Sequence, residues 1–373
     1  MKNTFEPAII GGIEVKNRIF RSATYGAYAV DNKPSQKTIE LYENLSKGDV
    51  GLIIFGYAVF SSTDHYAGNV PVIKDDTMIN LKKVTDTVHQ YGTKIVAQIN
   101  HSGAQLFAPP EGPVYGPSEY VDPLSGITAT AFSIEQIKEF VKEFGKAALI
   151  SKEAGFDGVQ IHGAHGYLLS KFLSPTFNKR TDEYGGDTKR NMQIVVDIFK
   201  EIKTTCGKDF PVWIKLNSSD FETEDKGLTE EEFLVIGEEL SKVGMDAIEV
   251  SGGTATGFYS AMRSLRHSAY HLESAKKLSE KVDSSVILVG GIRDVDTIDS
   301  ILEDTKIEGI SISRALVKEP GLVKRWQDGD RSPAKCVACN GCLNFKGLQC
   351  YFDLSPEEQE EQKPIMKMMQ SKN

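Results

Sequence analysis

The chain has 373 residues, of which 40% are hydrophobic and 25% are charged. This composition is ordinary for a globular protein, and the length is sufficient to bury a full core without disulfide bonds. The net charge is −9, and the basic residues are scattered along the sequence. Nucleic acid is therefore not an expected partner, because phosphate binding needs a basic face.

The N-terminus and the cysteines both favour a cytoplasmic protein. The first ten residues, MKNTFEPAII, lack the long apolar core of a signal peptide. The longest apolar run, residues 50–60, is too short to span a bilayer and contains glycines, so we expect no membrane association. Four of the five cysteines lie near the C-terminus, which fits a reducing compartment with a metal or cluster site better than a disulfide framework.

Apolar, β-branched runs recur along the chain, and each is followed by a helical pattern. Short runs of nearly continuous apolar character are typical of parallel strands that are buried on both faces. We predict eight such strands, at residues 18–22, 50–55, 94–99, 158–161, 212–216, 247–250, 285–289 and 309–312. Eight strand–helix units predict an α/β fold of the (β/α)8, or TIM barrel, type.

The segments between these strands carry clear helix signals. Residues 134–154 and 230–243 are amphipathic, and capping boxes mark both starts, Ser133 with Gln136 and Thr229 with Glu232. No proline-rich or charged linker divides the units, so we predict one barrel over residues 1–330. Residues 331–373 would form a short cysteine-bearing extension, and its charged tail from Ser355 is expected to be solvated or disordered.

Two histidines and a tyrosine directly follow the predicted strand at residues 158–161. They are His162, His165 and Tyr167. The C-terminal ends of barrel strands carry the active site in this fold. Imidazole N–H groups can hold a developing oxyanion, and a phenol can deliver a proton. A single histidine at such a place is more often a satisfied loop residue, but the combination at a strand end favours a catalytic site.

This stretch resembles the signature of the Old Yellow Enzyme family of FMN-dependent ene-reductases, in the branch with 2,4-dienoyl-CoA reductase and trimethylamine dehydrogenase. The motifs are IHGAHGYLLSKFLSP and NKRTDEYGGDTKRN, and the resemblance extends from Phe5 to about Cys350. It implies that NADH or NADPH reduces FMN, and that flavin N5 then gives hydride to the C=C bond of an α,β-unsaturated carbonyl compound. His162 and His165 would bind the carbonyl oxygen, and Tyr167 would protonate the α-carbon. The family also implies a homo-oligomer.

The resemblance further implies which residues bind the flavin. In the family, the first two strands contact the ring, a glutamine binds its pyrimidine edge, and a cation faces its N1 side, where negative charge gathers on reduction. The loops after strands seven and eight bind the phosphate, as is common in barrels. The matching residues here are Ser22, Ala23, Thr24, Tyr25, Gly56, Tyr57, Gln98, Lys215, Gly290, Gly291, Ser313 and Arg314.

From the residues alone, simpler interpretations of these positions stay open. A buried Gln98 must find partners in any fold, and Lys215 on a core strand could form a structural salt bridge. The glycine pairs could simply make tight turns, and they do not form the G-x-G-x-x-G dinucleotide fingerprint. A barrel with no flavin, such as a phosphate-binding lyase or a ligand-binding module, therefore remains an alternative on fold alone.

Three positions depart from the family pattern. Tyr25 stands where many relatives carry Cys or Thr near the reactive edge of the flavin, Tyr57 where they carry small residues, and Ala104 where many carry Arg. These departures bear on the redox potential and on one substrate or phosphate contact. The long segment of residues 105–132 is rich in Pro and Gly, and we expect it to form a wall over the active site with a short hairpin near residues 128–132.

Four cysteines, in the sequence CVACNGCLNFKGLQC, follow the predicted barrel. Clustered thiolates suit an iron–sulfur cluster or tetrahedral zinc. The dienoyl-CoA reductase branch carries a 4Fe-4S cluster here, but with longer gaps, so a cluster, zinc and no metal remain alternatives. A cluster would imply a second function, an FMN/iron–sulfur dehydrogenase that passes electrons to a separate partner protein. The four candidate ligands are Cys336, Cys339, Cys342 and Cys350.

Overall fold

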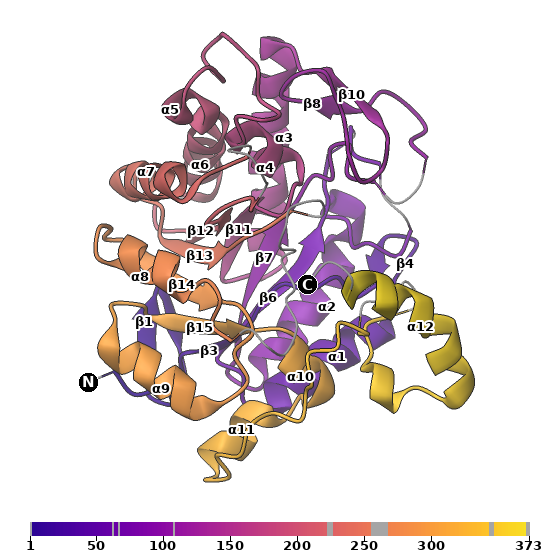
Figure 1. The fold of residues 1–373 in the computed structure, drawn as a ribbon, viewed down its shortest axis with the longest axis vertical. Coiled ribbons are helices and arrows are strands. Elements are labelled where there is room, and N and C mark those ends of the chain that lie inside the picture. Colours follow the sequence, from indigo (N-terminus) through magenta and orange to yellow (C-terminus); the bar gives the residue numbers. More distant parts are fainter. Residues whose placement is uncertain are drawn as a thin grey trace.

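The computed structural model describes residues 2–61, 63–65, 68–106, 109–221, 227–254, 268–342 and 347–370 (Figure 1). Eight parallel strands close into a barrel, which confirms the predicted fold. Each of the eight barrel strands overlaps one of the predicted apolar runs. In barrel order they are β3 (Ile19–Arg21), β6 (Leu52–Ala58), β7 (Lys94–Ile99), β11 (Gly158–Gly163), β12 (Val212–Asn217), β13 (Ala247–Ser251), β14 (Ser285–Val289) and β15 (Gly309–Ile312).

Helices surround the barrel, and both predicted capping boxes are present at the starts of α3 and α7. In each box a hydroxyl accepts from a backbone N–H one turn on, which satisfies a donor that the helix start leaves unpaired. The helices are α1 (Gln36–Lys47), α2 (Met78–His89), α3 (Ile134–Glu153), α4 (Leu168–Leu173), α5 (Thr188–Asn191), α6 (Gln193–Cys206), α7 (Glu230–Lys242), α8 (Leu272–Ser279), α9 (Val295–Asp304), α10 (Arg314–Lys318), α11 (Leu322–Gln327) and α12 (Pro356–Gln370), with 3-10 turns at Asp75–Thr77 and Tyr351–Asp353.

An N-terminal hairpin, which we did not predict, closes the bottom of the barrel. Its strands β1 (Ala8–Ile10) and β2 (Ile13–Val15) are joined by Gly11 and Gly12, whose positive φ angles of 52° and 80° suit a tight turn. The hairpin packs on apolar side chains of the barrel interior such as Trp213, whose indole N–H donates to the Gly11 carbonyl at 2.8 Å. This end of the barrel is a packed core, so the polar interior residues lie at the opposite end.

The predicted wall segment forms a small sheet beside the barrel. Strand β10 (Thr128–Ala131) pairs antiparallel with β9 (Tyr120–Val121), as the expected hairpin requires. It also pairs in parallel with β8 (Tyr115–Gly116), a third strand that we did not predict. A buried ion pair between Asp122 and Lys171, at 3.4 Å, joins this sheet to α4. A further short pair, β4 (Ala29–Val30) and β5 (Lys33–Pro34), follows the first barrel strand.

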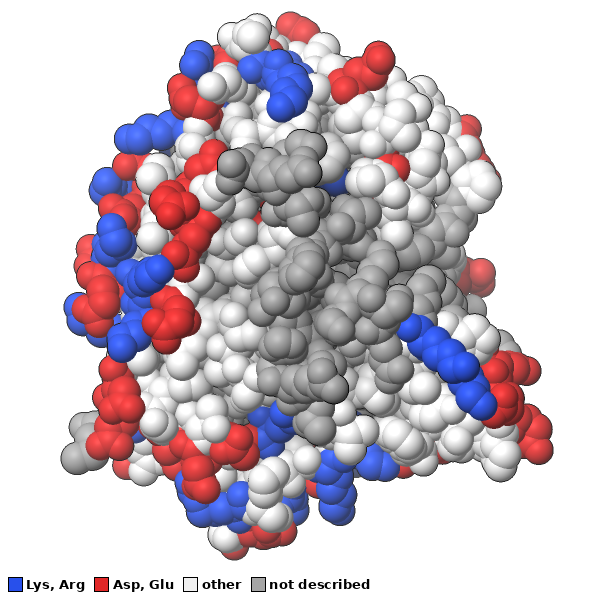
Figure 2. Space-filling view, viewed as in Figure 1, with Lys and Arg blue, Asp and Glu red and all other residues white. Residues whose placement is uncertain are grey.

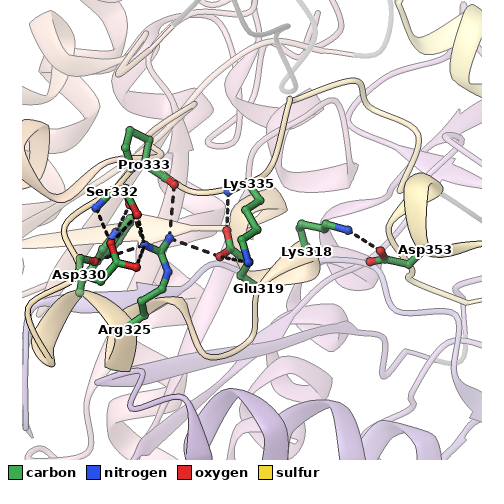
Figure 3. Close-up of polar contacts among 9 residues, drawn as sticks. Lys318, Glu319, Arg325, Asp330, Ser332, Pro333, Lys335 and Asp353 are labelled. Carbon is green, nitrogen blue, oxygen red and sulfur yellow. Dashed lines mark hydrogen bonds and ion pairs between the residues drawn. The ribbon is translucent and has the colours of Figure 1, made fainter.

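Residues after the barrel pack back onto it. The Arg325 guanidinium contacts Glu319, Asp330 and the backbone carbonyls of Ser332 and Pro333 (Figure 3). The Glu319 carboxylate also accepts from the backbone N–H of Lys335. Farther along, the backbone N–H of Leu348 donates to the Gly26 carbonyl at 2.9 Å. The extension is thus held along one side of the barrel mouth.

Residues 356–370 form α12, so of the two expectations for the tail, solvated or disordered, the second was wrong (Figure 1). Most of its described side chains are exposed, as expected for a solvated segment. Ser355 and Glu358 exchange hydrogen bonds across the start of this helix, so it too begins with a capping box. Gln362, which is buried, donates to the Gly341 carbonyl. The helix therefore has a docked face as well as a charged one.

Charges of both signs lie side by side on the surface over α7 and α8 (Figure 2). Several of them form ion pairs, such as Lys277 with Glu230 at 2.6 Å and Lys281 with Glu238 at 2.8 Å. Exposed pairs of this kind contribute little to stability. Within the described part of the chain, none of the helices has the length and apolar character needed to cross a membrane.

Candidate active site

A cavity of about 310 Å³ lies at the C-terminal ends of the barrel strands, within the usual size range of ligand pockets. It brings together all of the predicted catalytic and flavin-binding residues except Gly56. Gly56 lies next to the lining residue Tyr57, and its carbonyl accepts from the backbone N–H of Thr24 at 3.0 Å. Of the cysteines, only Cys336 lines this cavity.

The lining also contains residues that were not predicted from the sequence. They are Gln105, Ser251, Thr254, Tyr270, His271, Val289, Ile292, Arg293, Ser311, Ile312, Ala315 and Ala338. Most lie at the end of a barrel strand or within four residues after it, so the rule that strand ends carry the site could have nominated them. Their side chains alone gave no such signal, because isolated Ser, Tyr or Gln residues are common in any loop.

His162, His165 and Tyr167 form one wall of the cavity. His162 is central: its ring centroid lies 5.2 Å from that of His165 and 5.1 Å from that of Tyr167, in edge-on arrangements. The backbone N–H of Ala164 donates to His162 Nδ1 at 3.3 Å, so the other nitrogen, Nε2, carries the proton. His165 Nε2 lies 2.7 Å from the Ser251 hydroxyl.

Burial keeps both imidazoles neutral. For His162, desolvation, followed by repulsion from His165 and Lys215, lowers the pKa well below its usual value. For His165, desolvation, followed by repulsion from Lys215, lowers the pKa to about 3. A neutral imidazole still has one N–H to donate. The wall can therefore offer hydrogen bonds to an oxygen atom without carrying charge at ordinary pH.

Tyr167 lies among other hydroxyl and amide groups. Burial raises its pKa to about 12, while hydrogen bonds to Tyr57 and Gln105 act in the opposite direction. Burial, followed by Tyr167, raises the pKa of Tyr57, and the hydroxyls of the two tyrosines are hydrogen-bonded to each other. The ring of Tyr57 stacks in turn on Tyr25 with centroids 6.0 Å apart. Two of the three departures from the family pattern, Tyr25 and Tyr57, thus form an aromatic wall next to Tyr167.

A buried polar network forms the floor of the cavity. The ammonium group of Lys215 lies 3.1 Å from Glu249 and donates to the Ser22 hydroxyl at 2.9 Å. On the other side, Gln98 donates to Gln160 at 2.7 Å, and Gln160 donates to Glu249 at 2.9 Å. Gln160 and Glu249 were not predicted; they lie beneath the residues that line the cavity. The buried charge of Lys215 is therefore paired, as burial requires.

Glycines, hydroxyls and arginines gather at the end of the cavity formed by the loops after β14 and β15. Gly290 and Gly291 both have positive φ angles, 138° and 73°, which glycine adopts without strain. The buried hydroxyl of Ser311 lines the cavity and has no hydrogen-bond partner within the described chain. Arg293 and Arg314 lie at the same end. This composition is suited to an anionic group.

A second, smaller pocket of about 30 Å³ adjoins this end of the cavity, and all four C-terminal cysteines line it. Their thiols are free rather than disulfide-bonded. Arg314, Cys336 and Ala338 border both pockets. Among the residues that the structure describes, no group of three or more His, Cys, Asp or Glu side chains is arranged to hold a metal ion.

Comparisons with known proteins agree with this architecture. Residues 3–332 match the model of the NADH:flavin oxidoreductase / NADH oxidase family. An NADPH dehydrogenase of Bacillus subtilis is 32% identical over 86% of this chain and 92% of its own length. A metal reductase of Desulforamulus reducens is 32% identical over 92% of this chain. The chain spans about half the length of that relative, 52%.

A solved structure of a 2-naphthoyl-CoA reductase in complex with 2-naphthoyl-CoA has the same fold, with a TM-score of 0.86 at 23% identity. It covers 97% of this chain, and the match covers 58% of that protein. FMN and NAD(P)H are the cofactors that fit the matched family, and a small molecule is the substrate that it implies. The chain belongs to the NADH:flavin oxidoreductase / NADH oxidase family, which is the Old Yellow Enzyme family indicated by its histidine motif.

Proposed function

We propose that this protein is an FMN-dependent NAD(P)H oxidoreductase that reduces the C=C bond of α,β-unsaturated carbonyl compounds. One observation carries the proposal: two neutral imidazoles and a phenol share one wall of the cavity, and the floor beneath it carries a paired lysine. Neutral hydrogen-bond donors next to a proton donor are the arrangement that reduction of a polarised C=C bond requires.

The residues present fit an FMN. Gln98 and Lys215 would hold the pyrimidine edge of the ring, and the Ser22–Tyr25 segment would lie along it. At the other end, the unpaired hydroxyl of Ser311 and the glycine backbone would accept the phosphate, with Arg314 as the cation. An enclosed hydroxyl without a partner is costly unless a ligand satisfies it. When bound, FMN would accept hydride from NAD(P)H and deliver it to the substrate.

The chain's own residues then orient and protonate the substrate. His162 and His165 would donate hydrogen bonds to the carbonyl oxygen, where negative charge develops as the C=C bond is reduced. Tyr167 would give its hydroxyl proton to the α-carbon. The hydrogen bond from Tyr57 would stabilise the phenolate that remains on Tyr167. NAD(P)H and the carbonyl substrate would use the same cavity in turn.

The first experiment is the visible absorption spectrum of protein purified without oxygen, followed by identification of what denaturation releases. Released FMN supports the proposal, and a colourless protein that cannot be reconstituted with FMN rules it out.

The Tyr167→Phe variant then separates the two half-reactions, reduction of the flavin by NAD(P)H and reduction of the enone by the flavin. We expect reduction by NAD(P)H to persist and enone reduction to slow by about 10²-fold or more, the usual contribution of a general acid. If neither half-reaction changes, Tyr167 is not the acid.

The ligand role of the histidines has its own test. We expect His162→Ala and His165→Ala each to weaken the binding of a phenolic ligand such as p-hydroxybenzaldehyde, because each removes one donor to its oxygen. Difference absorption spectroscopy of the bound flavin measures this affinity directly. Unchanged affinity in both variants would remove the two histidines from the binding site.

A second function, an FMN/iron–sulfur dehydrogenase that passes electrons to a separate partner protein, is favoured by one observation. The four cysteines line a pocket that shares Cys336 with the main cavity. Within the described residues, the four cysteine side chains are not arranged to hold a metal ion. No step of the proposed reaction uses a metal. Iron and acid-labile sulfide in anaerobic protein, lost in Cys339→Ser, would support the cluster and the dienoyl-CoA reductase branch. Bound zinc, or no metal, would argue against this second function and leave ene-reductase activity as the proposed function.

A further inference from the structure

Glu249 is a buried carboxylate for which the proposed reaction has no use. It lies on β13, is 0% exposed, and does not line the cavity. In the sheet register it is paired with Lys215 of the neighbouring strand β12. A fully buried carboxylate is rare unless it is paired, and an unpaired one would be very costly. Its contacts therefore indicate why it is present.

Both oxygens of Glu249 are engaged by groups that belong to the floor of the cavity. Oε1 accepts from the Ser22 hydroxyl at 2.9 Å. Oε2 accepts from Gln160 at 2.9 Å and lies 3.1 Å from the ammonium group of Lys215. Lys215 itself also donates to Ser22, so Lys215, Ser22 and Glu249 form a closed triangle of contacts.

The orientation of this ion pair matters for the cavity. Lys215 lines the cavity, whereas Glu249 lies beneath it. The pair is neutral overall and presents its positive end to whatever occupies the cavity. A paired cation attracts a nearby negative charge more weakly than a bare cation does, and inside a protein such differences are larger than in water.

We propose that Glu249 is a positioning residue that neutralises Lys215 and thereby sets the reduction potential of the bound flavin. This inference rests on the proposed function, in which Lys215 faces the edge of the flavin that gains negative charge on reduction. The carboxylate lowers the potential, because it offsets the cation that would otherwise favour the reduced form. Glu249 also holds Lys215 and Ser22 in position through the contact triangle.

The test is the midpoint potential of FMN in Glu249→Gln, measured against a reference dye by absorption. The amide keeps the shape of the side chain and removes its charge. We expect the equilibrium to shift at least tenfold toward the reduced flavin, which is about 30 mV for a two-electron couple. An unchanged or lower potential in a variant that binds FMN overturns the inference.

Three further variants assign the shift to the ion pair. Glu143→Gln removes a half-buried carboxylate that bonds Ser61, outside the cavity, and should leave the potential unchanged. In a Lys215→Met background, Glu249→Gln should produce little upward shift, because a fully buried carboxylate that has lost its ion-pair partner takes up a proton, so the substitution no longer removes a charge. Should Glu249→Gln fail to fold, Glu249→Asp replaces it. Withdrawing the carboxylate by one methylene should raise the potential by a smaller amount, and no rise overturns the inference.

The same measurements separate this inference from the proposed function. If the wild-type protein neither contains nor takes up FMN, the proposed function fails, and the inference fails with it. If FMN binds and Glu249→Gln leaves its potential unchanged, only the role of Glu249 is lost. The potential is read without any carbonyl substrate, so the identity of the substrate does not affect the result.

Discussion

The surroundings of His165 keep its imidazole neutral. Its folded-state pKa is about 3, because burial and Lys215 disfavour the cation, whereas a histidine in an unfolded chain titrates near 6.5. Between these two values the unfolded chain binds a proton that the folded chain does not. The free energy of unfolding must therefore fall as the pH decreases through this window.

This gives a prediction for His165→Asn. The variant lacks the titrating group, so its stability should depend less steeply on pH between pH 6.5 and pH 4. The difference in slope should approach about 1.4 kcal/mol per pH unit, which corresponds to one proton. Urea unfolding at several pH values measures it. Parallel pH dependences for the variant and the wild type would mean that His165 titrates normally in the folded protein.

Tyr57 gives a second prediction at the residue scale. Its hydroxyl is hydrogen-bonded to that of Tyr167, and Tyr57→Phe removes this bond. The pKa of Tyr167 should rise further, and proton delivery should slow. We expect the enone half-reaction to slow several-fold relative to flavin reduction by NAD(P)H, in line with general-acid behaviour. Stopped-flow absorbance of the flavin follows both steps, and an unchanged ratio would contradict the proposed role.

Some residues of the site could be predicted from the sequence, and others could not. Residues such as His162, Tyr167 and Lys215 were found because a family motif or a strand position marked them. Gln160 and Glu249 were missed because buried polar residues on barrel strands carry no local signal. Their roles depend on partners from neighbouring strands, such as Lys215. These partners follow from the register of the strands, which was not predicted.

At the element scale, the strands and helices that were easiest to predict have strong local causes. The barrel strands are short apolar runs buried on both faces, and α3 and α7 start at capping boxes. The elements that were missed depend on distant contacts. The hairpin of β1 and β2 is defined by packing on the barrel interior, and β8 by pairing with a strand more than ten residues away.

Helix α12 is a different case, because its start signal was present and was overlooked. Ser355, Pro356 and Glu358 form a capping box with proline at the first helical position. The high charge of the segment favoured a disordered tail instead. What settles the question is the docking of Gln362 onto Gly341, a tertiary contact that the composition cannot reveal.

The capping boxes lead to a prediction for the start of α7. The Thr229 hydroxyl accepts from the backbone N–H of Glu232 at 3.2 Å. Thr229→Ala should lower the free energy of unfolding by about 1 kcal/mol, the usual value of an N-cap. Thr229→Ser keeps the hydroxyl and serves as the matched control. Equal stability of the alanine and serine variants in urea unfolding would show that the cap contributes nothing.

At the scale of the whole molecule, the contacts of Glu319 hold the extension against the barrel (Figure 3). Glu319→Ala would leave the backbone N–H of Lys335 without its acceptor and Arg325 with fewer partners. We expect faster tryptic cleavage near Arg331 and Lys335, with the barrel intact. Glu360→Ala, which removes an exposed pair with Lys363, is the control and should not change the cleavage rate.

The shared wall of the two pockets has a consequence for how they fill. Arg314, Cys336 and Ala338 face the main cavity on one side and the cysteines on the other. A ligand that shifts or orders this wall from either side changes the affinity of the opposite side, and thermodynamic linkage makes the two effects equal in size. Flavin content and the occupancy of the cysteine pocket should therefore vary together from one preparation to the next.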